Sequence, residues 1–442
     1  MSKAIATTAT IALFIFIDVA PMTAQAAGFA VMEQNASRLG TAYAGGAAEA
    51  SDASVVHFNP AGMTHLEGRQ FSISGVAFLP KIEFSNAGSL SPAGTPLTGD
   101  NGGNAAKTSV VPNLYFVDTL NNGIKYGLSV TAPAGVQLEH ATDWVGRYYN
   151  TKSVFEVVNI SPALAFTVDT GTAIGAALDI QYGRARQSKA LDFGSACYGI
   201  APPAFCARQG LFPQGADGLA AVAGHDWAFG YHVGIQQDVT PDTRIGLLYR
   251  SKVAHKIVGS TRFSGVPAFL SGSFADTRTE AEIALPASLS FSGVSRITPA
   301  LSVMADATWT RWNSFNELRI HFDNPPPTGD DITREEWKNS WRFALGAEYR
   351  YTPELSLRAG FARDQTPVTE PLRTPAIPDS SRNTLALGLG YKLSRSSSID
   401  VGYTHLFVAK GSVSLSSALQ GTLNGSYDNS VNVVGVQYNQ AF

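Results

Sequence analysis

The stretch TLALGLGYKL, residues 384–393, places a bulky apolar side chain at every second position. A period of two is the geometry of a β-strand whose two faces meet different surroundings. The other face carries Gly, Ala, Thr and Lys, and the same alternation recurs in residues 341–351, 355–361 and 399–403. A soluble sandwich would place a charged surface opposite its core. Small and polar residues instead suit the crowded lumen of a barrel whose exterior meets lipid.

The spacing of the alternating segments predicts fourteen strands. They lie near 69–84, 106–118, 123–133, 153–168, 171–188, 226–239, 242–262, 277–297, 300–322, 334–351, 354–365, 381–393, 397–413 and 426–442. Every second connection is short, and the longest of the others covers residues 189–225. Short turns on one side and long loops on the other are typical of outer-membrane barrels. Trp309, Trp312, Trp337 and Trp341 fall near strand ends, where aromatic rings suit a membrane interface. The sequence therefore predicts an all-β fold, a 14-stranded antiparallel transmembrane β-barrel.

The N-terminus indicates export. Lys3 is followed by an apolar stretch, and Ala24-Gln25-Ala26 forms a small-x-small cleavage box. This pattern predicts a signal peptide over 1–26, since the apolar run is too short for a membrane helix. We expect the mature chain in the outer membrane of a Gram-negative bacterium, exported with a cleaved signal peptide. Charged residues make up 15% of the chain and the net charge is −3, so nucleic acid is not expected as a partner.

Residues 27–68 break the strand pattern and are rich in small residues. They have too little apolar mass for a core of their own, and a fourteen-strand barrel leaves a lumen that they could fill. The segment is therefore predicted to be an N-terminal hatch inside the barrel, which itself spans 69–442. Pro60 fixes its own backbone and biases Asn59 toward an extended shape, so Asn59-Pro60-Ala61 should set one turn of the hatch.

Several short motifs, in order along the chain, resemble the bacterial outer-membrane long-chain fatty-acid channels, the FadL family. They are Ala27-Gly28-Phe29, the stretch LGTAYAG at 39–45, Asn59-Pro60-Ala61, Tyr249-Arg250-Ser251, Pro367-Val368, the stretch IPDSSR at 377–382, and the terminal Phe442. The resemblance implies passive uptake without cofactor or bound metal. Hydrophobic ligands would bind among the extracellular loops, move to a pocket near the hatch, and leave sideways through a kink in the third strand.

The third strand contains a candidate for that kink. Pro133 cannot donate a ladder hydrogen bond, and Gly135 has no side chain to hold the pleat. The residues alone leave two readings open, a break within the strand or simply its end. The resemblance favours the break, because Gly135 falls where the relatives kink.

The longest loop holds two further candidates. Cys197 and Cys206 are expected to form a disulfide in an oxidising compartment, with two free thiols as the alternative. Exposed apolar residues often mark a binding surface. Phe205 and Phe212, together with Phe269 and Leu270 of the loop 263–276, could form the first ligand-binding site or could merely cover the barrel mouth.

Two basic residues are candidates for the ligand head group. The resemblance places Lys189 where the fatty-acid channels hold a carboxylate, and Arg334 is the nearest match to a second basic partner, with a one-residue gap. A carboxylate in an apolar pocket needs a cation and hydrogen bonds. The alternative is that both are solvated charges at the barrel rim.

Recognisable catalytic motifs are lacking, and the histidines do not have metal-binding spacing. We therefore expect no enzyme, but a passive channel for hydrophobic compounds, with fatty acids as the first hypothesis and neutral or aromatic hydrocarbons as the second. A barrel enzyme and a structural or adhesin barrel are the alternatives from other classes. The expected partners are hydrophobic small molecules, outer-membrane lipid and lipopolysaccharide, and the chain is expected to be a monomer.

Overall fold

The computed structural model describes residues 28–120 and 122–442. The predicted signal peptide lies outside the described residues. The strands are β1 (Gln70–Asn86), β2 (Ser109–Thr119), β3 (Lys125–Glu139), β4 (Lys152–Asp169), β5 (Thr172–Asp192), β6 (Asp217–Thr240), β7 (Thr243–Arg250), β8 (Val253–Ser264), β9 (Thr277–Leu285), β10 (Ser288–Arg296), β11 (Leu301–Thr310), β12 (Glu317–Phe322), β13 (Asp331–Arg334), β14 (Ser340–Arg350), β15 (Leu355–Asp364), β16 (Arg382–Lys392), β17 (Ser397–Val408), β18 (Gly411–Ser417) and β19 (Gly421–Ala441).

These strands form a closed antiparallel barrel of 14 strands, as predicted. Neighbours in the chain pair with one another, and β1 pairs with β19 along its whole length to close the wall. Five barrel strands are each divided into two segments, namely β7/β8, β9/β10, β11/β12, β13/β14 and β17/β18. Over the described residues, closure gives every barrel strand a partner on each side along at least part of its length, which suits a sheet in a membrane.

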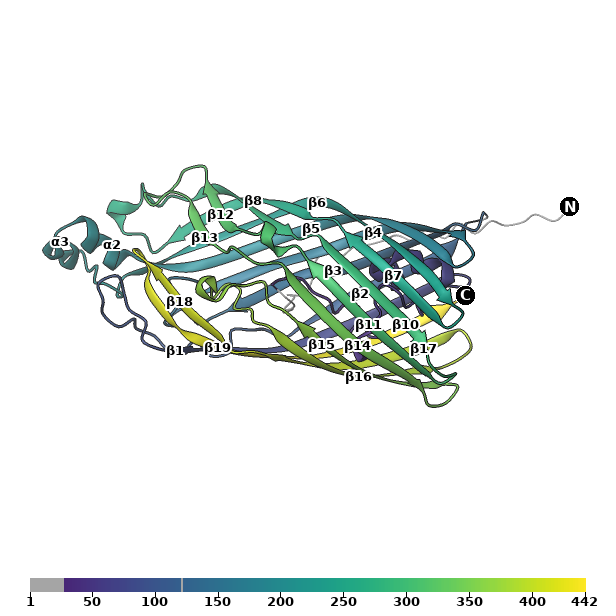
Figure 1. The fold of residues 1–442 in the computed structure, drawn as a ribbon. Helices are drawn as coiled ribbons and strands as arrows, with labels where there is room; N and C mark the ends of the chain where they lie inside the picture. The colour runs from purple at the N-terminus through teal and green to yellow at the C-terminus, as the bar shows by residue number, and fades with distance from the viewer. Residues whose placement is uncertain (1–27, 121) are drawn as a thin grey trace.

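The alternation read from the sequence separates the two faces of the wall. Leu385 and Leu387 are more than half exposed on the outside, whereas Ala386 between them is buried inside. The long loops lie at one end of the barrel, which carries the helices α2 (Phe193–Ile200) and α3 (Pro203–Arg208), and the C-terminus lies at the other (Figure 1). The longest loop is shorter than predicted, because β5 and β6 stay paired out to Asp192 and Asp217.

Residues 28–68 lie inside the barrel, at the end opposite α2 and α3 (Figure 1). Their regular parts are η1 (Leu39–Thr41), α1 (Val55–Phe58) and η2 (Pro60–His65). Glycines on the inner face of the wall let this backbone come close. A Cβ atom at Gly360 would lie 2.2 Å from the carbonyl carbon of Thr41, so any larger residue there would displace the segment.

Among the helices within the described parts of the chain, none is long and apolar enough to cross a membrane.

Candidate functional site: an apolar cavity above the hatch

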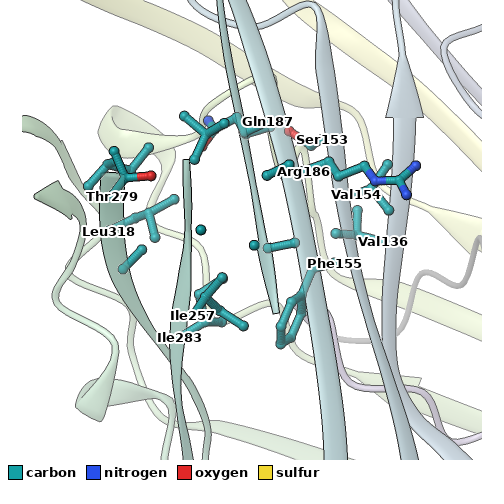
Figure 2. A pocket seen from close by; sticks show the side chains of 18 of the residues that line it. Val136, Ser153, Val154, Phe155, Arg186, Gln187, Ile257, Thr279, Ile283 and Leu318 are labelled. Carbon is teal, nitrogen blue, oxygen red and sulfur yellow. The ribbon is translucent and has the colours of Figure 1, made fainter. Parts of the chain in front are cut away.

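An apolar cavity lies inside the barrel, between the hatch and the long loops. The space between its lining side chains measures about 740 Å³, solvent-open parts included. The lining residues that face the lumen are Phe29, Val136, Ser153, Phe155, Ala185, Gln187, Val222, Gly224, Ile257, Gly259, Thr279, Ala281, Ile283, Phe315, Leu318, Ile320, Ala376 and Ile377. Most are apolar, and β4, β5, β8 and β9 supply one side (Figure 2). Such an apolar lining suits a hydrophobic molecule.

Arg186 also borders the cavity but does not point into it. It follows Ala185 on β5 and therefore projects from the opposite face of the strand. Figure 2 shows its head group beside Val154, away from Phe155, Ile257 and Ile283.

An aromatic cluster built around Phe29 forms the floor of the cavity. The Phe29 ring lies 5.5 Å from Phe155, 4.9 Å from Trp312 and 5.6 Å from Trp337, centroid to centroid. Trp312 and Phe315 come from the interruption between β11 and β12, and Trp337 from the one between β13 and β14. The prediction of an interfacial position is thus wrong for Trp312 and Trp337, which are buried in the lumen, while Trp341 is 43% exposed on the outer face.

The third strand is irregular where Pro133 and Gly135 lie. Strand β3 continues to Glu139, but its register with β4 shifts between Thr131 and Ala134. Its pairing with β2 ends at Leu114 opposite Val130. Beyond that point the backbone of β3 bonds to the hatch instead of β2. Val31 N donates to Pro133 O (2.9 Å), and Gly135 N donates to Phe29 O (2.9 Å). The residue that forms the floor of the cavity is therefore held by the irregular part of β3.

Asn59 ties the hatch turn to the wall. Its side-chain amide donates to Ala47 O at 2.7 Å and to Ile235 O at 3.2 Å, and its carbonyl oxygen accepts from Ala61 N at 3.1 Å. Pro60 opens η2 at a position where a missing N–H costs nothing. The three residues thus form one turn, in which Asn59 contacts β6 and β7 while Pro60 and Ala61 lie against Gly175 of β5.

Lys189 and Arg334 do not meet. Lys189 is on the inner face of β5, and its ammonium group binds Asp331 Oδ2 at 2.6 Å. Arg334 pairs with Glu336, and its side chain is 70% exposed. Its register partner is Glu317. The pair Ile320 and Asp331 is three positions away and faces the lumen, so Arg334 and Glu317 face outward. The interpretation of Arg334 as a lumenal partner of Lys189 is therefore corrected, and neither residue lines the cavity.

The residues predicted in the loops lie apart from the cavity, at the tip of the barrel. Cys197 and Cys206 form a disulfide that joins α2 to α3. Phe205 packs edge-on against Phe269 at 5.8 Å, and both rings remain over 40% exposed. Phe212 is 53% exposed, whereas Leu270 is buried beneath the loop.

Sequence reasoning missed the lining of the cavity itself. A signal was present, because Val136, Phe155, Ile257 and Ile283 are apolar residues on strand faces that elsewhere carry small or polar side chains. Residues 153–158, SVFEVV, are apolar on both faces and so depart from the alternation used to find the strands. Across residues 28–120 and 122–442, no group of three or more His, Cys, Asp and Glu side chains is placed to hold a metal ion.

Comparison with known proteins adds to this geometry. Residues 17–442 match the family model described as outer membrane protein transport protein (OMPP1/FadL/TodX). The long-chain fatty acid transport protein of Escherichia coli K12 is 29% identical over 415 residues, which cover 89% of this chain and 91% of that protein. The crystal structure of a Pseudomonas aeruginosa FadL homologue matches with a TM-score of 0.86 at 24% identity, covering 94% of this chain and 100% of that one.

The fold also resembles the Pseudomonas putida toluene transporter TodX. The TM-score is 0.68 at 16% identity, with 94% of this chain and 100% of that chain covered. A closed barrel, an apolar lumenal cavity and the match across almost the whole sequence agree with one another. This chain is an outer-membrane β-barrel of the OMPP1/FadL/TodX family, whose members are transport channels for hydrophobic compounds rather than enzymes.

Proposed function

We propose that this channel takes up long-chain fatty acids by passive diffusion, with lateral release into the membrane. The observation that carries the proposal is the position of Phe29, which lines the apolar cavity while its backbone is bound to the irregular part of β3. A ligand in the cavity therefore touches a residue whose backbone is bound to the stretch of β3 that no longer pairs with β2. Movement of residues 29–31 would connect the cavity with the gap between β2 and β3.

The first contact would be made at the loop tip. The exposed rings of Phe205, Phe212 and Phe269 offer apolar surface beyond the membrane. A ligand that binds there leaves water before it reaches the cavity, which lowers the barrier to entering the barrel. The disulfide between Cys197 and Cys206 holds α2 and α3 together so that this surface keeps its shape.

A neutral hydrocarbon is the second candidate ligand. The lumen-facing lining of the cavity includes Ser153, Gln187 and Thr279 as its polar members, and it needs no charged ligand. TodX, named a toluene transporter, shares the fold. Uptake of oleate and of toluene by the same cells distinguishes the two hypotheses.

The lateral exit is tested by repairing β3. We expect Pro133→Val, which restores an N–H donor, and Gly135→Val, which favours a regular strand, to reduce oleate uptake to the level of cells without the channel. Ligand binding to the purified protein at the loops should persist. Gly75→Val on β1 is the matched control, because a Cβ there meets only a side-chain carbon of Val110 at 4.0 Å.

Passage straight through to the periplasm is the competing route. A cysteine pair at Ala36 and Gly435, whose Cβ atoms would lie 3.0 Å apart before adjustment, would fix the hatch to the wall. Normal uptake by the β3 variants, together with loss of uptake in the oxidised cysteine pair, would favour this route and contradict lateral exit.

A further inference from the structure

The ion pair between Lys189 and Asp331 crosses the inside of the barrel. Lys189 is on β5 and Asp331 on β13, and along the wall β6, β8, β9 and β12 lie between them. Five strand spacings amount to about 24 Å of wall. The ammonium nitrogen and the carboxylate oxygen are nevertheless 2.6 Å apart. The pair therefore links two distant parts of the wall rather than two neighbouring strands.

The pair lies at the entrance of the apolar cavity. Lys189 shares the inner face of β5 with Ala185 and Gln187, which line the cavity, and it is nearer to the long loops. Asp331 is the register partner of Ile320, another lining residue, and is the first residue of β13, at the end of that strand nearer to the long loops. A molecule that moves from the loops into the cavity along β5 and the β12–β13 pair passes this bridge.

We infer that Asp331 is a specificity-determining residue, an internal carboxylate that holds Lys189 across the entrance until the carboxylate of a ligand replaces it. This inference rests on the proposed uptake of fatty acids. Exchange of one carboxylate for another leaves Lys189 paired and returns Asp331 toward water, where its side chain is already 30% exposed. An uncharged molecule has to separate the pair without replacing either charge, which is unfavourable for partly buried groups. The bridge thus favours anionic amphiphiles over neutral ones of the same length.

Binding of oleate and of oleyl alcohol to the purified full-length protein tests the inference, since the two ligands differ in the head group. Asp331→Asn removes the internal competitor and should strengthen oleate binding about three- to tenfold, with oleyl alcohol unchanged. Lys189→Met should weaken oleate binding about ten- to a hundredfold and again spare the alcohol. The exchanged pair Lys189→Asp with Asp331→Lys should restore oleate binding.

Asp330→Asn is the matched control. Asp330 is the neighbouring residue and pairs with Arg319 and His321 on the outer face, so its change should affect neither ligand. Arg334→Ala should likewise leave the binding of both ligands unchanged. Equal changes for both ligands in Asp331→Asn, no change for either, or weaker oleate binding would each overturn the role of Asp331 as a competitor.

If the cavity does not bind fatty acids at all, a different result is expected. Ala185→Trp fills the cavity and should weaken the binding of both oleate and oleyl alcohol. If both bind the wild-type protein but neither is affected by Ala185→Trp, the cavity is not the binding site, whatever Asp331 does.

Discussion

Replacement of Asn59 by Ala should loosen the hatch while leaving the barrel folded. Asn59 is 1% exposed and links Ala47, Ala61 and the wall through one side chain. Loss of the cap on Ala61 N costs about 1 kcal/mol. Loss of the bond to Ala47 O costs about another 1 kcal/mol, and not more, because Gln236 still donates to that carbonyl at 2.9 Å.

The expected sum of about 2 kcal/mol corresponds to an opening equilibrium about thirtyfold more favourable. Hydrogen exchange of the amides in residues 55–65 should accelerate by about that factor, while amides of β15 and β16 exchange as in the wild type. Oleate uptake at equal surface amounts should fall, because the loosened segment no longer positions the ligand beside the irregular part of β3, from which the movement of residues 29–31 would release it.

Asn432→Ala provides the matched control for this substitution. Asn432 accepts hydrogen bonds from Tyr403 and His405 at 2.8 Å on the outer face, far from the hatch. Wild-type exchange and wild-type uptake in Asn59→Ala would show that the turn does not hold the hatch, and would remove it from the mechanism.

Two further predictions concern the long-loop end. Burial lowers the pKa of His140, which stacks on Trp144, from its ordinary value of 6.5 to about 4. The unfolded loop therefore binds a proton first as the pH falls, so protection of residues 140–151 from exchange, corrected for intrinsic rates, should be full above pH ~6.5 and decline toward pH ~4. His140→Phe should abolish this pH dependence, and a dependence that persists would assign it to another group. Replacement of Cys197 and Cys206 by Ser removes the disulfide that closes a short loop, which lowers the stability of the loop by about 2–3 kcal/mol. Proteolysis within residues 193–216 should therefore rise while the barrel stays resistant. Unchanged cleavage would mean that the packing of α2 on α3 holds the loop without the disulfide.

The number and order of the barrel strands could be predicted because lipid imposes the same rule on every strand. An outward residue such as Leu387 faces hydrocarbon, and its neighbours Ala386 and Gly388 face the packed lumen, so alternation persists along the segment. Burial of the hatch followed from the same reasoning, because a segment poor in apolar mass needs a surface to pack against. These are properties of composition and period, which a single sequence contains.

The face on which Arg334 lies could not be predicted in this way. Trp341 points outward, and a regular strand extended back from it would place Arg334, seven residues earlier, on the inside. The interruption between β13 and β14 reverses the alternation, so that Ile332 and Arg334 point outward together. The cause is tertiary: Trp337 turns into the lumen to pack on Phe29, a residue that is far away in the sequence.

The irregular positions of the wall converge on one residue. The register shift in β3 presents the N–H of Gly135 to Phe29, the interruption after β11 brings in Trp312 and Phe315, and the interruption after β13 brings in Trp337. A regular fourteen-strand wall would offer the lumen only the inner half of each strand, evenly spaced. The depth of the cavity and the residue that closes it are therefore set by the places where strand pairing fails. Barrels with the same number of strands can differ in ligand when such breaks differ, since strand count fixes the width of the lumen and the breaks determine how it is filled.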